Sequence, residues 1–174
     1  MLPSSSIRKA LIIILFAAVG LRLISAVYQG NNVTVLPGIY DQISYDGLAR
    51  RFVDGYGFSF GQDHWPMTPA GQPTAHWSYL YTFYLVAIYT LFGPQPLAAR
   101  LLQAVIVGVL QTYLTYRIAE KTFSKRVGVI AAGINALYLY FVYYGGALMT
   151  EPFYITAILG SLFIATLCDE HGNK

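Results

Sequence analysis

Asp41 and Glu151 are the residues of this chain that best suit acid–base chemistry. Each is a lone carboxylate at the border between a polar loop and a long apolar segment. A carboxylate that is partly buried and held in a fixed direction can take a proton from a hydroxyl group. It can also bind sugar hydroxyls or a cationic group. We therefore expect these two residues to mark an active site if the fold brings them to one face.

An apolar pattern follows Asp41 and is formed by Tyr45, Leu48, Ala49 and Phe52. This spacing predicts an amphipathic helix over 41–54 that lies along the membrane surface. Asp41 then stands at the N-cap, where a carboxylate accepts hydrogen bonds from backbone N–H groups. The alternative is a general base in a cleft at the membrane surface. The two interpretations are compatible, because a capping position also holds the carboxylate in a defined direction.

Glu151 precedes Pro152 at the entry to the last apolar segment. Proline is tolerated in the first turn of a helix, and an anion interacts favourably with a helix N-terminus. That interaction alone would account for a carboxylate here. An ionisable residue at the border of a membrane segment is nevertheless a functional candidate. We predict that Glu151 is a second acidic residue of the site.

Two arginines and a histidine are candidates for binding a phosphate. Arg22 lies within the first apolar segment and Arg100 near the outer end of a later one, where long cationic side chains commonly reach the headgroups. Both fall toward the outer leaflet, where cations are less expected, so a lipid-linked phosphate is a reasonable partner. His76 is a further candidate for phosphate contact. His64 and His76 have no second ligand pattern nearby, so they do not indicate a metal site, and no residue pattern indicates a cofactor.

The elements that must position these residues belong to a membrane protein. Hydrophobic residues make up 56% of the chain and charged residues 11%, and the apolar stretches exceed a soluble core helix in length. We predict an all-α integral membrane fold. The net charge of +3 is not gathered into a basic run, which argues against nucleic acid as a partner. A single cysteine, Cys168, excludes an internal disulfide.

Four segments approach the length of a spanning helix, at about 10–28, 97–117, 127–144 and 152–168. The outer loop 29–96 between the first two contains the amphipathic helix and an interfacial helix over 78–92, which is too short to span. Two cations before the first segment and four in the loop 117–126 indicate the cytoplasmic side, which places both carboxylates outside. If 78–92 crossed the membrane, the carboxylates would lie on opposite sides.

Taken together, these motifs resemble the N-terminal part of the GT-C glycosyltransferases. The nearest branch is that of the protein O-mannosyltransferases and the lipid A aminoarabinose transferases. The resemblance covers nearly the whole chain in the family's order. The matching segments are Tyr40 to Ala49 with the turn Gly55 to Phe58, Pro73 to Tyr79, Leu97 to Leu102, and Leu148 to Pro152.

The resemblance implies a membrane enzyme that transfers a sugar, with inversion, from a polyprenyl-phosphate donor to an acceptor on the outer or periplasmic face. It implies Asp41 as the base, Glu151 as a second acidic residue, and Arg100 as a cation that steadies the leaving phosphate. Tyr45 and Gln42, in the first motif, are our candidates for substrate binding. Gln42 stands where many relatives have Glu, which leaves the use of a divalent metal open.

Members of the family have more spans than the four predicted here. We therefore expect either a fragment that contains the catalytic half or a short form that needs a partner or self-association. Two rival hypotheses stay open: a non-catalytic subunit that binds a polyprenyl-phosphate lipid or a partner glycosyltransferase, and a small membrane scaffold whose carboxylates only cap helices. The polar tail after Cys168 is expected in the cytoplasm. A bacterial inner membrane fits a chain without clear eukaryotic signals.

Overall fold

The computed structural model describes residues 4–172, and the regular secondary structure in this range is helical. The all-α prediction is confirmed. Three of the helices, α1, α4 and α7, are long and apolar enough to cross a membrane, and α5 with α6 forms a fourth candidate that is bent by 54°. The helices are α1 (Ser4–Gln29), α2 (Gln42–Val53), α3 (Tyr79–Phe92), α4 (Pro96–Thr122), α5 (Lys125–Leu137), α6 (Leu139–Gly145) and α7 (Glu151–Gly172).

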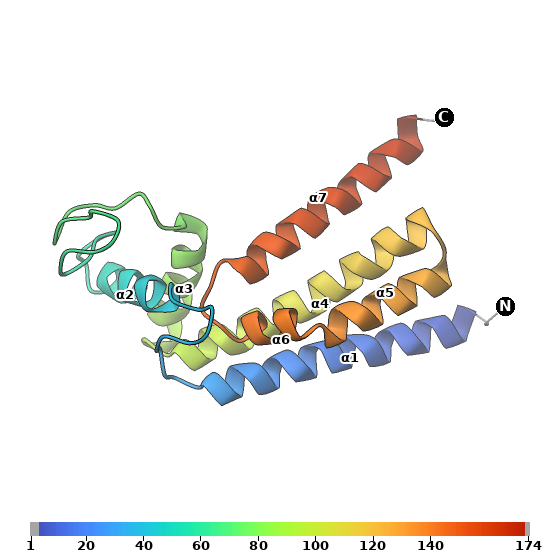
Figure 1. Cartoon of the computed structure of the whole chain (residues 1–174), viewed down its shortest axis with the longest axis horizontal. Helices are drawn as coiled ribbons and strands as arrows, with labels where there is room; N and C mark the ends of the chain where they lie inside the picture. Colours follow the sequence, from blue (N-terminus) through green and yellow to red (C-terminus); the bar gives the residue numbers. More distant parts are fainter. Residues whose placement is uncertain (1–3, 173–174) are drawn as a thin grey trace.

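The long helices form a bundle in which α1, α4 and α5 pack side by side, while α7 contacts α4 and leans away from the others (Figure 1). The start of α1, the turn between α4 and α5 and the end of α7 lie at one end of the bundle. The helices α2 and α3 and the loop between them lie at the opposite end. The start of α2 and the start of α7 therefore share one end of the molecule.

Small and polar residues allow the helices of the bundle to approach closely. A Cβ added at Gly108 of α4 would lie 3.1 Å from the Cα of Val19 in α1. Between α4 and α5, the Thr112 hydroxyl donates to Asn135 Oδ1 (3.1 Å), and Asn135 Nδ2 donates to Thr115 Oγ1 (3.0 Å). Hydrogen bonds of this kind between membrane helices contribute about 0.6 kcal/mol each.

The predicted span 127–144 is not one helix. α5 ends at Leu137 and α6 begins at Leu139, because Tyr138 between them has an extended backbone (φ −66°, ψ 111°). Neither proline nor glycine marks this position in the sequence, so the bend could not be read from it. The bend directs α6 toward the end of the bundle that carries α2.

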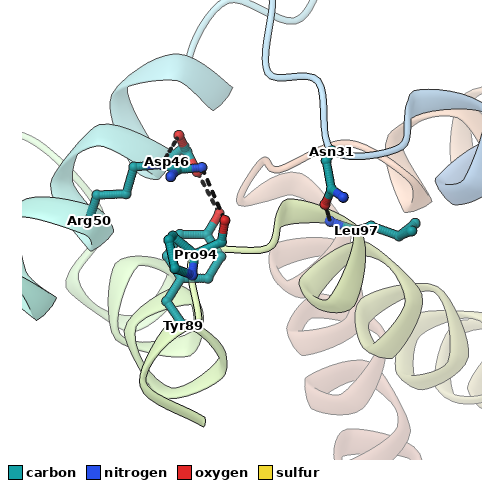
Figure 2. Close-up of polar contacts among 6 residues, drawn as sticks. All are labelled: Asn31, Asp46, Arg50, Tyr89, Pro94 and Leu97. Carbon is teal, nitrogen blue, oxygen red and sulfur yellow. Dashed lines mark hydrogen bonds and ion pairs between the residues drawn. The ribbon is translucent and has the colours of Figure 1, made fainter. Parts of the chain in front are cut away.

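Helix α3 has 14 residues and lies across the end of the bundle (Figure 1). Ser78 caps its start by accepting the Tyr81 N–H (3.4 Å), and Gly93 with φ +77° ends it. The next helix starts within a few residues, where Asn31 Oδ1 accepts the Leu97 N–H (2.9 Å; Figure 2). The length of α3 is below the roughly 20 residues of a spanning helix. We retain the prediction that α3 lies at the membrane surface.

Candidate functional site

A small apolar cluster joins the two loops that carry the predicted carboxylates. Ile39, Ala147 and Met149 are buried together. Asp41 follows Ile39 by two residues, and Glu151 follows Met149 by two residues. Burial of this cluster therefore brings both carboxylates to the same end of the bundle, although they are far apart in the sequence.

Two tyrosines of α6 fix the loop before Asp41. The Tyr143 hydroxyl donates to the Pro37 carbonyl (3.1 Å), and the Tyr144 hydroxyl donates to the Gly38 carbonyl (2.8 Å). The sequence places these tyrosines at the outer interface but does not reveal their hydrogen bonds, because the partners lie more than a hundred positions earlier in the chain. The two tyrosines therefore connect α6 directly to the segment that leads into α2.

Gln103 of α4 holds the connection between α6 and α7. Its side chain is fully buried, and its amide nitrogen donates to the carbonyls of Ala147 (2.7 Å) and Gly145 (3.2 Å). Its amide oxygen accepts the hydroxyl of Tyr81 in α3 (2.9 Å). One side chain thus ties α3 and α4 to the turn that precedes Glu151.

The charges of both carboxylates act on the hydroxyl group of Tyr45 in α2. Tyr45, Ser78 and Thr150 line one cavity, and the Thr150 hydroxyl donates to Glu151 Oε2 (3.4 Å). Burial raises the pKa of Tyr45, and the negative charges of Asp41 and Glu151 raise it further. Tyr45 is therefore a protonated hydroxyl situated near two carboxylates.

A cavity of about 640 Å³ begins at Tyr45 and runs between α3 and α7. Its volume is in the usual range for a small-molecule site. Polar groups at one end belong to Tyr45, His76, Ser78 and Thr150. The walls formed by successive turns of α3 and α7 belong to Leu80, Tyr84, Phe153, Tyr154 and Ala157. The cavity therefore combines hydrogen-bonding groups with an apolar channel between two helices.

Asp41 is exposed and occupies the N-cap position of α2. The capping interpretation is wrong, because within the described chain its carboxylate makes no capping hydrogen bond. Glu151 is partly buried in the first turn of α7. Neither carboxylate is among the described residues of the cavity wall; Asp41 lies one helical turn before Tyr45, and Glu151 follows Thr150, and both Tyr45 and Thr150 line the cavity.

The structure places Arg100 and Gln42 outside the cavity wall. Both side chains are fully buried. The Arg100 guanidinium donates to the carbonyls of Gln29 (3.4 Å) and Gly30, and to Gln42 Oε1 (3.0 Å). The Gln42 amide nitrogen donates to the Thr34 carbonyl. These contacts join α1, α2 and α4. Phosphate binding by Arg100 and substrate binding by Gln42 stay predictions.

Arg22 lies inside the bundle rather than at its end. It is fully buried and donates to the Ala18 carbonyl (3.1 Å) and to Gln111 Oε1 (3.4 Å). Gln111 Nε2 donates to the Pro152 carbonyl at the start of α7 (2.8 Å). The side chain thus joins α1 to α4 and, through Gln111, to α7. It does not extend toward the headgroups as the sequence suggested.

Of the three predicted phosphate ligands, His76 lines the cavity, and Arg22 and Arg100 do not. His76 is exposed, and its ring meets Trp65 edge-on (centroids 5.3 Å apart) and Trp77 edge-on (5.6 Å). In the part of the chain that the structure describes, no three His, Cys, Asp or Glu side chains gather in a group that could hold a metal ion. A single imidazole at the polar end of the cavity is suited to contact an anion.

Sequence reasoning missed Asp46, a buried carboxylate of α2. Its Oδ1 accepts the Tyr89 hydroxyl of α3 (2.6 Å), and its Oδ2 pairs with Arg50 Nε (2.7 Å; Figure 2). Arg50 also donates to the Pro94 carbonyl (3.4 Å). Burial, followed by the charge of Asp46, raises the pKa of Tyr89. The i, i+4 spacing of Asp46 and Arg50 was the signal that could have revealed the pair.

The profile of the dolichyl-phosphate-mannose-protein mannosyltransferase family matches residues 77–174, which are 98 of the 174 residues. The chain belongs to this family. The resemblance to GT-C glycosyltransferases is thereby confirmed. No curated protein and no solved structure matches the chain. The matched region includes Glu151 and the cavity walls from α3 and α7, but it begins after Asp41 and Tyr45. Family membership therefore supports the part of the site formed by α3, α7 and Glu151, and the assignment of Asp41 and Tyr45 rests on the geometry.

Proposed function

We propose that this chain is a membrane glycosyltransferase module that transfers a sugar, with inversion, from a polyprenyl-phosphate donor to an acceptor hydroxyl on the outer face of the membrane. The observation that carries the proposal is a cavity with apolar walls whose polar residues, Tyr45 and Thr150, lie one turn after Asp41 and directly before Glu151. Membership in a mannosyltransferase family supports the reaction class.

The donor would occupy the cavity with its isoprenoid chain between α3 and α7, against Leu80 and Phe153. Its phosphate would lie near His76, Ser78 and the N-terminus of α3. Backbone N–H groups and the helix dipole favour an anion at such a terminus. The sugar would then lie near Tyr45 and Thr150, where a protonated phenol and a hydroxyl are available as hydrogen-bond partners.

Transfer would proceed by attack of the acceptor oxygen on the anomeric carbon. Asp41 would take the proton of the acceptor hydroxyl as the new C–O bond forms. The bond between the anomeric carbon and the phosphate oxygen would break, and its electron pair would leave with the polyprenyl phosphate. Glu151 would hold sugar hydroxyls. The exposure of Asp41 suits a base that meets an acceptor from the aqueous side.

The assignment to the outer face rests on the distribution of cations. Arg8 and Lys9 of α1, and Lys125 and Arg126 of α5, lie at the end of the bundle away from α2 and α3 (Figure 1). The positive-inside bias puts that end in the cytoplasm. The end with the two carboxylates would then face outward, which is the periplasm if the membrane is a bacterial inner membrane.

The test is sugar transfer by the full chain in nanodiscs, with Asp41→Asn compared with Asp54→Asn. Asp54 is an exposed carboxylate at the C-terminal end of the same helix and serves as the matched control. We expect Asp41→Asn to lower transfer by about 100-fold or more, with donor binding and folding retained, and Asp54→Asn to have little effect. Unchanged transfer by Asp41→Asn would refute the mechanism. Donor binding by the wild type without turnover would instead favour a non-catalytic lipid-binding subunit.

A further inference from the structure

The contacts of α2 divide between two of its faces. Asp41 and Tyr45 are four residues apart and lie on one face, and Tyr45 lines the cavity together with Thr150. Gln42 and Asp46 are also four residues apart, and they project from a face that is offset by one residue, or about 100°. The first face carries the groups proposed for the reaction, and the second carries buried polar contacts to the other helices.

The second face fixes α2 at two points. At its start, Gln42 is bound by Arg100 of α4 (3.0 Å). One turn later, Asp46 accepts the Tyr89 hydroxyl of α3 (2.6 Å; Figure 2). Arg50, paired with Asp46 on the same helix (2.7 Å), donates to the Pro94 carbonyl after α3 (3.4 Å). Helix α2 has 12 residues, a length at which an isolated helix is marginal in water. Its position therefore depends on what it contacts.

Apolar packing alone would define that position poorly. Leu48 and Ala49 of α2 are fully buried in a cluster with Leu85 and Ile88 of α3. Apolar contacts are non-directional, so such a cluster tolerates a small rotation of the helix. The short hydrogen bond from the Tyr89 hydroxyl of α3 to Asp46 is directional and would be broken by the same rotation, whereas the ion pair with Arg50 lies within α2 and would turn with it.

We propose that Asp46 is a positioning residue for the proposed sugar transfer, which sets the rotation of α2 and thereby the direction of Asp41 and the place of Tyr45 in the cavity wall. The inference rests on the proposed function for its kinetic consequence. Asp46 itself acts through Tyr89 and Arg50 and contacts neither substrate. It is a residue that the family match, which begins at position 77, does not include.

The test compares Asp46→Asn with the double variant Asp46→Asn/Arg50→Gln, with Asp54→Asn as the control. In Asp46→Asn the single amide oxygen is contested by Arg50 and the Tyr89 hydroxyl, and the cation takes it, so Tyr89 loses its acceptor. In the double variant the introduced glutamine can accept from the Asn amide nitrogen, which leaves the Asn oxygen free to accept the Tyr89 hydroxyl. We expect Asp46→Asn to lower kcat by about 10- to 100-fold, because small misplacements of reacting groups have effects of this size. The KM for the donor should change little, since most of the cavity wall belongs to α3 and α7. The double variant should recover most of the lost kcat.

A second measurement reports on the position of α2 without any activity. Trp77 contacts Tyr45 edge-on (centroids 5.3 Å apart), and the chain has one other tryptophan, the exposed Trp65. In a Trp65→Phe background, emission from Trp77 should shift in Asp46→Asn and return in the double variant. If Asp46→Asn does not fold, Tyr89→Phe removes one hydrogen bond, keeps the ring, and should give smaller changes of the same kind.

A loss of kcat with unchanged Trp77 emission, or no rescue by the double variant, overturns the proposal. Unchanged kcat and emission in Asp46→Asn also overturn it. If the wild type transfers no sugar, the proposed function fails on its own. The emission then still decides whether Asp46 sets the position of α2: a shift that the double variant reverses supports this, and a constant emission refutes it.

Discussion

Replacement of Gly146 by alanine tests whether close packing against α1 positions the loop before Glu151. A Cβ at this position would lie 2.7 Å from Ser25 Oγ, 2.8 Å from the Ala26 backbone nitrogen and 2.8 Å from Gln29 Nε2. Non-bonded carbon contacts are normally about 3.5–4.0 Å, so the loop and α1 would have to separate by roughly 0.7–1 Å. The φ of Gly146 is −94°, which alanine adopts without strain. The predicted effect is therefore purely steric.

The expected loss is about 1–3 kcal/mol of unfolding free energy, as for other overpacked sites. Gly160→Ala in α7 is the matched control, because no atom of the described chain lies within 4 Å of its added Cβ. Alanine is favoured over glycine in a helix by about 1 kcal/mol, so this control should be neutral or slightly stabilised. Denaturation in detergent micelles measures both variants.

The same substitution should affect the reaction. Glu151 lies five residues after Gly146, and a displacement near 1 Å at a reacting group can lower turnover by about 100-fold. Gly160→Ala should leave transfer unchanged. If Gly146→Ala and Gly160→Ala had the same stability, the loop between α6 and α7 would have room for an added methyl group beside α1. The packing argument would then be refuted.

Three further substitutions test other contacts. Gln103→Leu should cost about 2–4 kcal/mol in the same denaturation assay, because it leaves the buried Tyr81 hydroxyl and the Gly145 carbonyl without this partner and removes one of two donors to the Ala147 carbonyl. Equal stability would contradict this. Arg100→Lys should lower stability without raising the donor KM, because an ammonium group cannot span the acceptors that the guanidinium reaches, including Gln42. A selective rise in the donor KM would instead assign Arg100 to binding of the phosphate. Burial lowers the pKa of His64 below its ordinary value of 6.5, so the native state favours the neutral ring, and stability should fall as the pH drops below about 6.5. A His64→Gln variant should show a weaker dependence of Tm on pH, and an unchanged dependence would exclude His64 as its source.

Much of the architecture could be predicted because a bilayer constrains helix length. The apolar stretches that became α1, α4 and α7 were visible in the sequence, and α4 begins at Pro96, as proline at the first helical turn suggests. The break at Tyr138 could not be predicted, because it depends on tertiary contacts and no helix-breaking residue marks it. Likewise, Asp41 had the sequence signature of a cap without making the hydrogen bond.

The site was predictable only in part, because sequence gives position along a span but not the partner of a side chain. Asp41 and Glu151 share one end of the bundle, as charge bias and span number suggested. Arg22 contacts a residue 89 positions away, and Arg100 contacts residues 58 to 71 positions away. A buried arginine looks the same in sequence as an interfacial one. Asp46 was overlooked because its main partner, Tyr89, lies on another helix.

The buried position of Arg22 has a consequence for the order in which the protein is made. Its partner Gln111 is synthesised 89 residues later, so α1 reaches the membrane while its arginine has no interhelical acceptor. A cation at the centre of a spanning helix costs about 2.5–3.5 kcal/mol on insertion scales, and less toward its end, where Arg22 lies. The Ala18 carbonyl of α1 offsets part of this cost from the start, and Gln111 offsets more once α4 lies beside α1. We therefore expect a nascent chain that stops before Gln111 to hold its first helix less firmly in the membrane than the full chain does.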